Sequence, residues 1–393
     1  MATRDAPRRP SRLSVGRVRG EWLTGYLFVL PATLVIGVFG LFPILYAIYM
    51  SLHRWRIRRS GFVGLEHYER TLGDIGAFGV ALLGIALIGV AHWLWTDLAS
   101  RSPWRRVMRL AAAVTLLFAG IALALGWQTM ALTGDTRFLM GLVRTFYYGF
   151  ISVPVQITLA LVLASLLFQP IAGRQIYRML FFLPYVTPVV AGAAVFRSIF
   201  SPREERLVNT VLSWFGIDAQ RWLFETRPVG QLLFGDLFTR AGMELPAFLA
   251  GGPSLALLTI ILFGIWTYTG YNAVIFLAGL GGIPKELYEA AAIDGANGPA
   301  RFFHITVPLL APITFYLTVL GFIGTFQAFT QLYVMREAAV RGAVDTAALV
   351  IFDTFYRRSD FGLAAAQSVV LFAIILALTL LQNRLFGRRA LRG

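Results

Sequence analysis

Few side chains of this sequence are of the types that perform covalent or metal chemistry. There is no cysteine, which excludes thiolate zinc sites, iron–sulfur clusters and cysteine nucleophiles. Lys285 is the only lysine and is followed by Glu286, so the Gly-Lys-Ser/Thr of a Walker A phosphate loop is absent. The four histidines show no metal-ligand spacing. We therefore predict no catalytic residue, no metal site and no cofactor in this chain.

Uncharged polar side chains inside the apolar runs could bind a solute. Polar groups at membrane depth are costly and tend to face a cavity. Amides carry both a donor and an acceptor, which suits a neutral, hydroxyl-rich solute better than an ion. For each of these residues a hydrogen bond between helices is the alternative role. The candidates for a substrate path are Gln156, Asn272, Gln327 and Gln331, with Tyr271 and Tyr333 as stacking surfaces.

The segment 281–308 has the most specific pattern. Two glycines are followed by the run Pro284-Lys285-Glu286-Leu287-Tyr288-Glu289-Ala290-Ala291-Ala292-Ile293-Asp294-Gly295. Pro284 suits the first turn of a helix, and acidic residues favour its positive amino-terminal end. Gly295 is placed to end the helix in a left-handed cap. We predict a helix of two to three turns lying along a membrane surface.

One stripe of this short helix is suited to a partner surface. Leu287, Ala290, Ala291 and Asp294 share it by their i, i+3, i+4, i+7 spacing. The small alanines would allow another surface to approach closely. The residues by themselves leave two interpretations open, an ordinary interfacial helix between two spans or a docking helix for another protein.

The amino-acid composition indicates that membrane-spanning helices position the candidate residues. Of the 393 residues 57% are hydrophobic and only 14% charged, with a mean hydropathy of +0.69. Soluble domains carry roughly 25% charged residues, so lipid must be part of the solvent. A spanning helix needs about 20 mostly apolar residues. We predict an all-α polytopic membrane protein with eight spans, at 23–50, 76–96, 109–130, 141–168, 179–200, 254–280, 306–333 and 362–386.

The chain has a net charge of +15, and the positions of its basic residues along the sequence set the predicted orientation. With eight spans, the arginines of the tail 1–22, of 98–109, of 169–178 and of the carboxyl-terminal tail all fall on one side. Basic residues in short segments mark the cytoplasmic side, so both termini are predicted to be cytoplasmic and the membrane, not nucleic acid, is the basic chain's partner. Four arginines between 54 and 59 would lie on the outer side in this arrangement, which disagrees with the rule that basic residues mark the cytoplasmic side.

The spacing within 281–308 resembles a known signature. Glu289-Ala290-Ala291, three residues, Gly295, nine residues and then Ile305-Thr306-Val307-Pro308 resembles the EAA motif of ABC importer permeases. That family usually has leucine where Val307 stands. Other segments resemble the carbohydrate-type, maltose-like branch of the family, and the likeness covers roughly 22–70 and 137–390. They include Leu30-Pro31-Ala32, Phe181-Phe182-Leu183-Pro184, Leu207-Val208-Asn209 and Asp360-Phe361-Gly362.

The resemblance implies an ABC type I importer permease core of six helices. Here an extra two-helix hairpin at 73–136 raises the number of spans to eight. A second departure is Met335-Arg336-Glu337, which stands where the branch carries a Thr-Gly-Gly-Pro turn. The expected organisation is a basic cytoplasmic tail (1–22), a first span (23–50), the hairpin, and a core domain (137–390) with an external cap (201–253) and the cytoplasmic coupling segment (281–308).

The resemblance also implies function and partners. The chain would be a non-enzymatic subunit in the plasma (inner) membrane of a prokaryote. With a second permease subunit it would form the path for a mono-, di- or oligosaccharide brought by an external solute-binding protein. Two cytoplasmic ABC ATPase subunits would hold ATP and Mg and drive transport. The alternative solute is glycerol-3-phosphate or another polar non-sugar. The expected coupling residues are Glu286, Glu289, Ala290, Ala291, Asp294, Gly295 and Pro308.

Two other classes of protein remain as alternatives. An intramembrane transferase would need acids, histidines or metal ligands at membrane depth, and His92 is the only histidine inside a predicted span. A proton- or ion-driven carrier would need Asp or Glu in the spans, and the predicted spans contain none that are buried in their middle. Both alternatives would make this chain active by itself, whereas an importer permease is inactive without its partners.

Overall fold

Helices make up nearly all of the structure, which is a computed structural model describing residues 12–56, 58–95, 105–246, 250–340 and 342–387. Six continuous helical segments are long and apolar enough to cross a membrane, and two sharply bent pairs of helices raise the number to eight if each pair is one span. The all-α polytopic fold is confirmed. Residues 1–11 of the predicted basic tail lie outside the described residues, as do Arg101, Arg388, Arg389 and Arg392.

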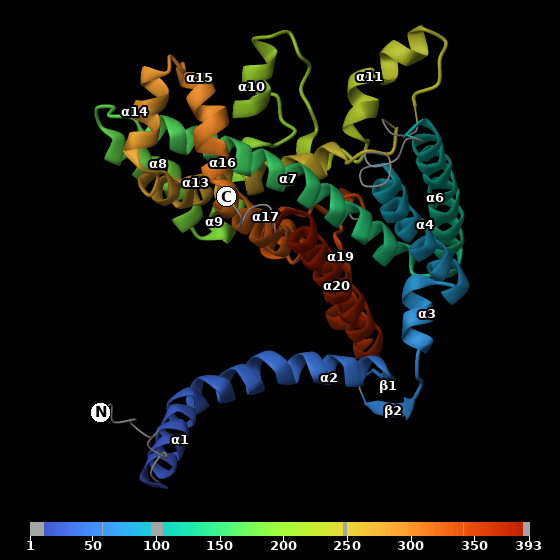
Figure 1. Ribbon diagram of the computed structural model, residues 1–393. Helices are drawn as coiled ribbons and strands as arrows, with labels where there is room; N and C mark the ends of the chain where they lie inside the picture. The colour runs from blue at the N-terminus through green and yellow to red at the C-terminus, as the bar shows by residue number, and fades with distance from the viewer. Residues whose placement is uncertain (1–11, 57, 96–104, 247–249, 341, 388–393) are drawn as a thin grey trace, which may run out of the picture.

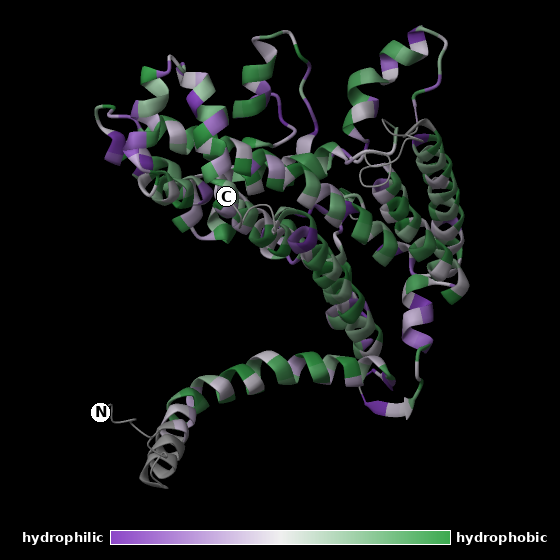
Figure 2. Cartoon of the chain, in the orientation of Figure 1, coloured by the Kyte–Doolittle hydropathy of each residue, from purple (hydrophilic) through white to green (hydrophobic). Residues whose placement is uncertain are grey.

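The continuous spans have long, mostly unbroken helices. The first consists of α1 (Arg12–Val35), a π-helical stretch η1 (Ile36–Leu41) and α2 (Phe42–Ser51), and Figure 1 shows it reaching away from the rest of the chain. Figure 2 shows that apolar residues dominate these helices. The others are α4 (Ile75–Trp93), α6 (Arg105–Thr133), α7 (Thr136–Phe168), α13 (Leu255–Gly281) and α20 (Phe361–Gln382) with η7 (Asn383–Gly387).

The predicted span 179–200 is not one straight helix. It consists of α8 (Arg174–Val186) and α9 (Val189–Ile199), which meet at 97°. Thr187 between them is extended, because the ring of Pro188 disfavours helical geometry in the residue before it. The span is therefore a bent pair of helices, a shape that the hydropathy of the sequence does not show.

The predicted span 306–333 is also broken. Its first part is α15 (Gly298–Arg301), η4 (Phe302–Thr306) and α16 (Val307–Leu309), which meets α17 (Ala311–Phe326) at 64°. The helix stops at Phe326, and a separate short helix α18 (Thr330–Met335) follows. The chain continues through η5 (Ala338–Val340), α19 (Ala347–Phe352) and η6 (Asp353–Arg357).

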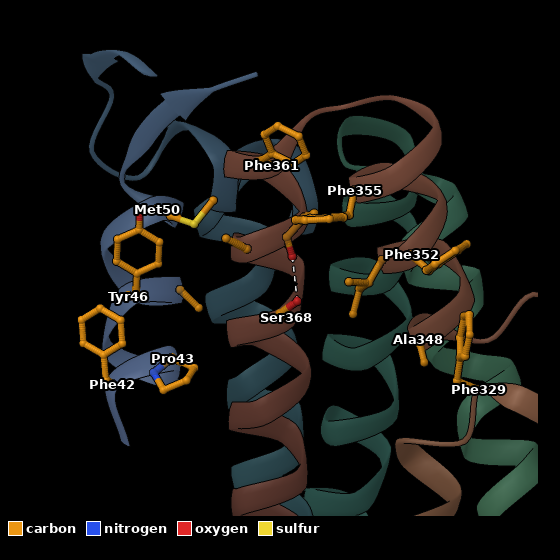
Figure 3. Close-up of a pocket in the computed structure, with 14 residues that line it drawn as sticks. Phe42, Pro43, Tyr46, Met50, Phe329, Ala348, Phe352, Phe355, Phe361 and Ser368 are labelled. Atoms are coloured by element: carbon orange, nitrogen blue, oxygen red, sulfur yellow. Dashed lines mark hydrogen bonds between the residues drawn. The ribbon is translucent and has the colours of Figure 1, made fainter. Parts of the chain in front are cut away.

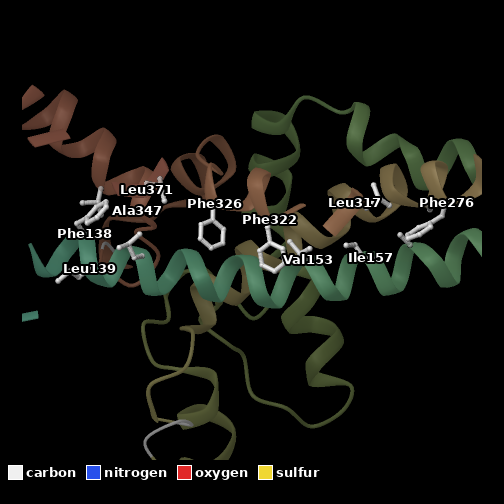
Figure 4. Close-up of a cluster of buried hydrophobic side chains, with 14 of the residues drawn as sticks. Phe138, Leu139, Val153, Ile157, Phe276, Leu317, Phe322, Phe326, Ala347 and Leu371 are labelled. Carbon is white, nitrogen blue, oxygen red and sulfur yellow. The ribbon is translucent and has the colours of Figure 1, made fainter. Parts of the chain in front are cut away.

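Helix α7 is the axis around which the other helices pack. Its buried face presents small and apolar side chains along its whole length, and α13 and α17 lie against it. Figure 4 shows side chains from several helices meeting along α7. From α7 come Phe138, Leu139, Val153 and Ile157, from α13 Phe276, from α17 Leu317, Phe322 and Phe326, and from α19 and α20 Ala347 and Leu371.

The inserted hairpin consists of α4 and α6, which pack mainly against each other. Its base is fixed by polar contacts: Asp74 caps α4 by accepting the Ala77 N–H at 3.0 Å, and its own N–H donates to Thr133 Oγ1 at 3.0 Å. Figure 1 shows the hairpin beside the amino-terminal end of α7, far from α1. It therefore joins the core at one end only.

The segment between the first span and the hairpin has a small structure that the sequence did not predict. Strands β1 (His53–Trp55) and β2 (Arg59–Phe62) pair antiparallel, and α3 (Glu66–Leu72) follows. Two of the arginines that disagreed with the predicted orientation have acidic partners here. Arg54 pairs with Glu66 at 2.9 Å and Arg56 lies 3.9 Å from Asp360, the residue that caps α20. These arginines thus fix local structure.

Short helices fill the predicted cap 201–253: α10 (Leu207–Ser213), η3 (Trp222–Phe224) and α11 (Val229–Arg240). The buried side chain of Asn209 organises this segment. Its Oδ1 accepts the Trp222 indole N–H at 2.7 Å and the Gln220 N–H at 3.1 Å, while its amide donates to the carbonyls of Ser201 and Arg203 at 3.3 Å. One amide thereby replaces the backbone hydrogen bonds that an irregular loop lacks.

A buried charge network holds α18, α19 and the start of α7 together. Arg336, whose side chain is 4% exposed, donates to Asp345 at 2.7 Å and to Asp353 at 2.9 Å. Arg357 and Arg137 lie 3.2 and 3.7 Å from Asp353. Burial alone would raise the pKa of Asp353, but the hydrogen bonds and charge of Arg336, together with Arg357 and Arg137, hold it below its ordinary value. The departure at Met335-Arg336-Glu337 is therefore structural.

The Arg336→Gln variant should be strongly destabilised. It leaves two buried carboxylates without their main partner, and breaking a buried pair in this way costs about 3–5 kcal/mol. The measurement is the thermal unfolding midpoint of the purified chain in detergent. Arg203→Gln, an exposed arginine outside these ion pairs, is the control and should leave the midpoint unchanged. Equal midpoints for the two variants would show that the network is unimportant.

Candidate functional site

The predicted short helix is present as α14 (Lys285–Ile293), with Pro284 as its N-cap residue and Asp294 as its C-cap residue. Gly295 follows with φ +83°, the left-handed conformation that favours glycine. Its N–H donates to Ala292 O at 3.1 Å, and the Ala296 N–H donates to Ala291 O at 2.8 Å. These two hydrogen bonds together form the Schellman motif, which ends the helix and turns the chain.

The partner-facing stripe of α14 is open. Glu286, Glu289, Ala290, Asp294 and Gly295 are exposed, as is Pro308 further on, while Ala291 is half-buried. Ile293 is 86% exposed, the highest value among the large apolar side chains of the described residues.

One contact that the sequence did not reveal ties α14 to the next span. The Tyr288 hydroxyl lies 2.9 Å from Thr306 Oγ1, and Thr306 is buried at the end of η4. Asn297 caps α15 by accepting the Ala300 N–H at 2.9 Å. The short helix is therefore held against the stem that leads into α17 and does not hang freely from two linkers.

A second candidate site is a cavity of about 140 Å³ among α7, α13, α17 and α18. Four of the six predicted path residues line it: Gln156, Tyr271, Asn272 and Gln331. Gln156 is 2% exposed and its Oε1 has no hydrogen-bond partner in the described part of the chain. Asn272 makes no side-chain hydrogen bond to the described residues. Two unsatisfied amides therefore face one cavity.

The other two predicted path residues lie elsewhere. Gln327 is exposed at the end of α17 and does not line the cavity. Tyr333 stacks on Phe329 with the ring centroids 5.3 Å apart and touches Phe352 edge-on. Neither side chain lines this cavity, so the structure does not bring these two residues together with the other four. Their assignment to the substrate path stays a prediction.

Three tyrosines belong to the cavity region but were not predicted. Tyr148 of α7 is buried and accepts a hydrogen bond from Gln331 Nε2 at 3.3 Å. Tyr268 also lines the cavity. Tyr185 of α8 stacks on Tyr271 at 4.4 Å between ring centroids. The spacing of Tyr148 eight residues before Gln156, about two helical turns, was the signal that could have found it.

Residues 137–392 match the protein family described as the binding-protein-dependent transport system inner membrane component. The chain belongs to this family. It is therefore a permease, the membrane-spanning subunit of an importer of the ABC type, in which ATP hydrolysis is the work of separate subunits. The sequence-based interpretation as an importer permease of the carbohydrate branch is confirmed, and the intramembrane transferase and the ion-driven carrier are excluded as its main function.

Several curated relatives are similar over most of this permease. The arabinooligosaccharides transport system permease protein AraP of Halalkalibacterium halodurans is 31% identical, over 66% of this chain and 74% of the relative. The lactose transport system permease protein LacF of Rhizobium radiobacter is 28% identical, over 92% and 93%. The sn-glycerol-3-phosphate transport system permease protein UgpA of Agrobacterium fabrum is 30% identical, over 78% and 93%.

Solved structures support the fold. A chain of a bacterial ABC transporter involved in the import of the acidic polysaccharide alginate matches with a TM-score of 0.59 and 18% identity, over 96% of this permease and 99% of that chain. A chain of a bacterial alginate ABC transporter in complex with a pentasaccharide-bound periplasmic protein matches with a TM-score of 0.52 and 20% identity, over 76% and 98%. At this identity the likeness concerns the fold alone.

The cavity of the permease depends on a close approach between α8 and α13. Gly270 of α13 lies against the backbone of Phe181, and an added Cβ would overlap with the Phe181 carbonyl oxygen. Only glycine allows this contact, which brings Tyr185 over Tyr271. The aromatic wall of the cavity therefore requires a residue without a side chain at position 270.

Gly270→Ala should lower the thermal unfolding midpoint of the permease, because overpacking a tight contact costs about 1–3 kcal/mol. The matched control is Gly120→Ala in α6, where an added Cβ meets nothing within 4 Å. We expect the control to be unchanged or slightly more stable. The close approach would be disproved if Gly270→Ala unfolded at the same temperature as the control.

Proposed function

We propose that this permease passes a neutral sugar, a mono-, di- or oligosaccharide, across the membrane. The observation that carries the proposal is the cavity, whose polar groups are amides, tyrosines and Thr325. Sugar hydroxyls donate and accept hydrogen bonds, and sugar rings stack on aromatic faces. Gln156 lines the cavity, and its amide makes no side-chain hydrogen bond to the described residues. A hydroxyl of the solute would give this amide a partner.

Glycerol-3-phosphate or another polar non-sugar is the alternative solute. Of the curated relatives named above, two carry sugars in their names and one carries sn-glycerol-3-phosphate. A phosphate at low dielectric needs a cation or several N–H donors. No lysine or arginine lines the cavity. The absence of cationic side chains from the cavity therefore favours a neutral sugar over a phosphorylated solute.

We propose that the path is completed by a second permease subunit. At about 140 Å³ the cavity is well below the roughly 300 Å³ at the lower end of ligand sites, so another surface must complete it. Most of the span Thr24–Ser51 is exposed in the described chain. An open apolar cleft of about 490 Å³ lies between its α2 part and helices α19 and α20, as Figure 3 shows. A second helical subunit would cover these faces.

The remaining partners follow from the position of α14. We place α14 and both termini on the cytoplasmic side, where the helix would dock on one of two ABC ATPase subunits that bind ATP and Mg. Glu289 would contact a cation of the ATPase, and Ile293 would enter an apolar pocket. An external solute-binding protein would deliver the sugar to the opposite face. ATP changes transport only through differential binding of two conformations, and α14 would carry that difference into α13 and α17.

Gln156→Leu should raise the KM for uptake about fivefold, because a hydrogen bond to a neutral group contributes about 1 kcal/mol. The assay uses proteoliposomes that contain the complete importer and the sugar that best stabilises the cognate binding protein in a thermal-shift panel. The thermal midpoint of the permease should not fall, since the variant removes a buried unsatisfied acceptor. Gln327→Leu, outside the cavity, is the control. Unchanged uptake in Gln156→Leu would contradict the proposed path.

Gly295→Ala should reduce ATP-coupled uptake about 5- to 30-fold. The left-handed conformation costs an alanine about 1–2 kcal/mol, so the turn that ends α14 would be formed in a smaller fraction of the molecules. Gly295→Asn should retain more activity because asparagine tolerates this conformation. Gly298→Ala is the control: its glycine has no positive φ, and an added Cβ meets nothing within 4 Å. Normal uptake in Gly295→Ala would count against coupling through α14.

A further inference from the structure

A groove of about 880 Å³ lies at the end of the bundle that carries α14. Three cations border it: Arg174 and Arg178 from α8, and Lys285, the first residue of α14. Figure 1 shows the start of α8 beside α14, and hydrophilic ribbon gathers there in Figure 2. Neither the coupling function nor the solute cavity uses these residues. The groove therefore needs an occupant of its own.

The charges of the groove are uncompensated. No carboxylate lines it, and none of the ion pairs among the described residues involves these three cations. Arg178 is held in place by donating from Nη2 to Leu167 O at 3.1 Å, yet its Nε is buried and has no hydrogen-bond partner. A guanidinium fixed at the border of the groove is suited to bind an oxyanion through its remaining accessible N–H groups.

The walls of the groove are apolar. Phe168 from the end of α7, Met179 and Phe182 from α8, and Val274 and Leu277 from α13 line it below the cations. A free phosphate would gain nothing from these side chains. An acyl chain would cover them, while its anionic headgroup would meet the cations at the surface. The pattern of charge and apolar wall matches an amphiphile.

We propose that this groove binds a phospholipid with a negatively charged headgroup. The headgroup phosphate lies among Arg174, Arg178 and Lys285, and an acyl chain lies along α8 and α13. Because Lys285 begins α14, the lipid touches the helix that couples transport. Anionic lipid in the membrane would thereby support the position of α14, whichever solute the permease carries.

The test is lipid binding to the full-length permease in non-ionic detergent, followed by native mass spectrometry during titration with dioleoylphosphatidylglycerol. Each cation that contacts the headgroup contributes about a fivefold change in binding, so the double variant R174Q/K285Q should bind about 30-fold more weakly. The charge-matched control is R301Q/R384Q, whose arginines do not line the groove. The control should bind as the wild type does. Unchanged binding in R174Q/K285Q, or an equal loss in the control, would overturn the proposal.

Further arms distinguish the sources of the anion. Dioleoylphosphatidylcholine should bind at least fivefold more weakly than the anionic lipid, and millimolar inorganic phosphate should not displace it. Ala278→Phe, which narrows the groove without changing its charge, should also lose retained lipid. Displacement by phosphate, with no effect of Ala278→Phe, would assign the site to a free anion. Loss of bound lipid when the ATPase subunits assemble would assign the groove to an acidic protein segment. Either result overturns the proposal that the groove binds lipid.

Discussion

The low polarity of the lipid interior is the constraint on which the rest of this structure depends. A backbone N–H or C=O without a hydrogen bond costs several kcal/mol in hydrocarbon, so spanning segments are helices and irregular backbone is tolerated only where protein or a cavity surrounds it. The chain obeys this rule. Two of its breaks, at Thr187-Pro188 and between Phe326 and Thr330, adjoin the region where tyrosines and amides gather, while the break at Leu310 lies in the stem that leads into α17. The first two interruptions therefore lie beside the cavity.

The same helices connect the cavity with the coupling segment. Helix α13 carries Tyr271 and Asn272 about two to three turns before it ends at Gly281, and α17 carries Thr325 at its far end. Between the two helices lie α14 and its stem, joined by the contact of Tyr288 with Thr306. A displacement of α14 would thus act on two helices that line the cavity. This is a physical connection between two sites, which coupling requires in addition to their separate existence.

Charge is used in three distinct ways along the chain. The network around Arg336 is buried and pairs its charge with two carboxylates, so its role is structural. The acids of α14 are exposed and offer contacts to a partner. The cations around the groove of α8 are neither paired nor distributed over an open surface. Burial and the presence of a partner, not the residue type, separate these roles.

Much of the site was predictable because its signals are local. The start and end of α14 depend on Pro284, the acids of the first turn and a glycine at position 295, all within twelve residues, and hydropathy alone located the spans. The sequence did not show the breaks within 306–333, because a run of apolar residues has the same hydropathy whether the helix is straight or broken. For that reason it did not show that Gln327 and Tyr333 lie outside the cavity. Tyr148, Tyr185 and Arg336 were missed since their partners lie 183, 86 and up to 17 residues away along the chain.

The sequence by itself determined the helical class, the membrane environment, the short helix α14 and the family. Each of these follows from composition or from interactions within one or two helical turns. Only the tertiary structure decided which amides share a cavity, which charges are satisfied and where the chain leaves a groove open. These properties depend on the packing of helices against each other, in which a single close approach such as that of Gly270 to Phe181 sets which side chains meet.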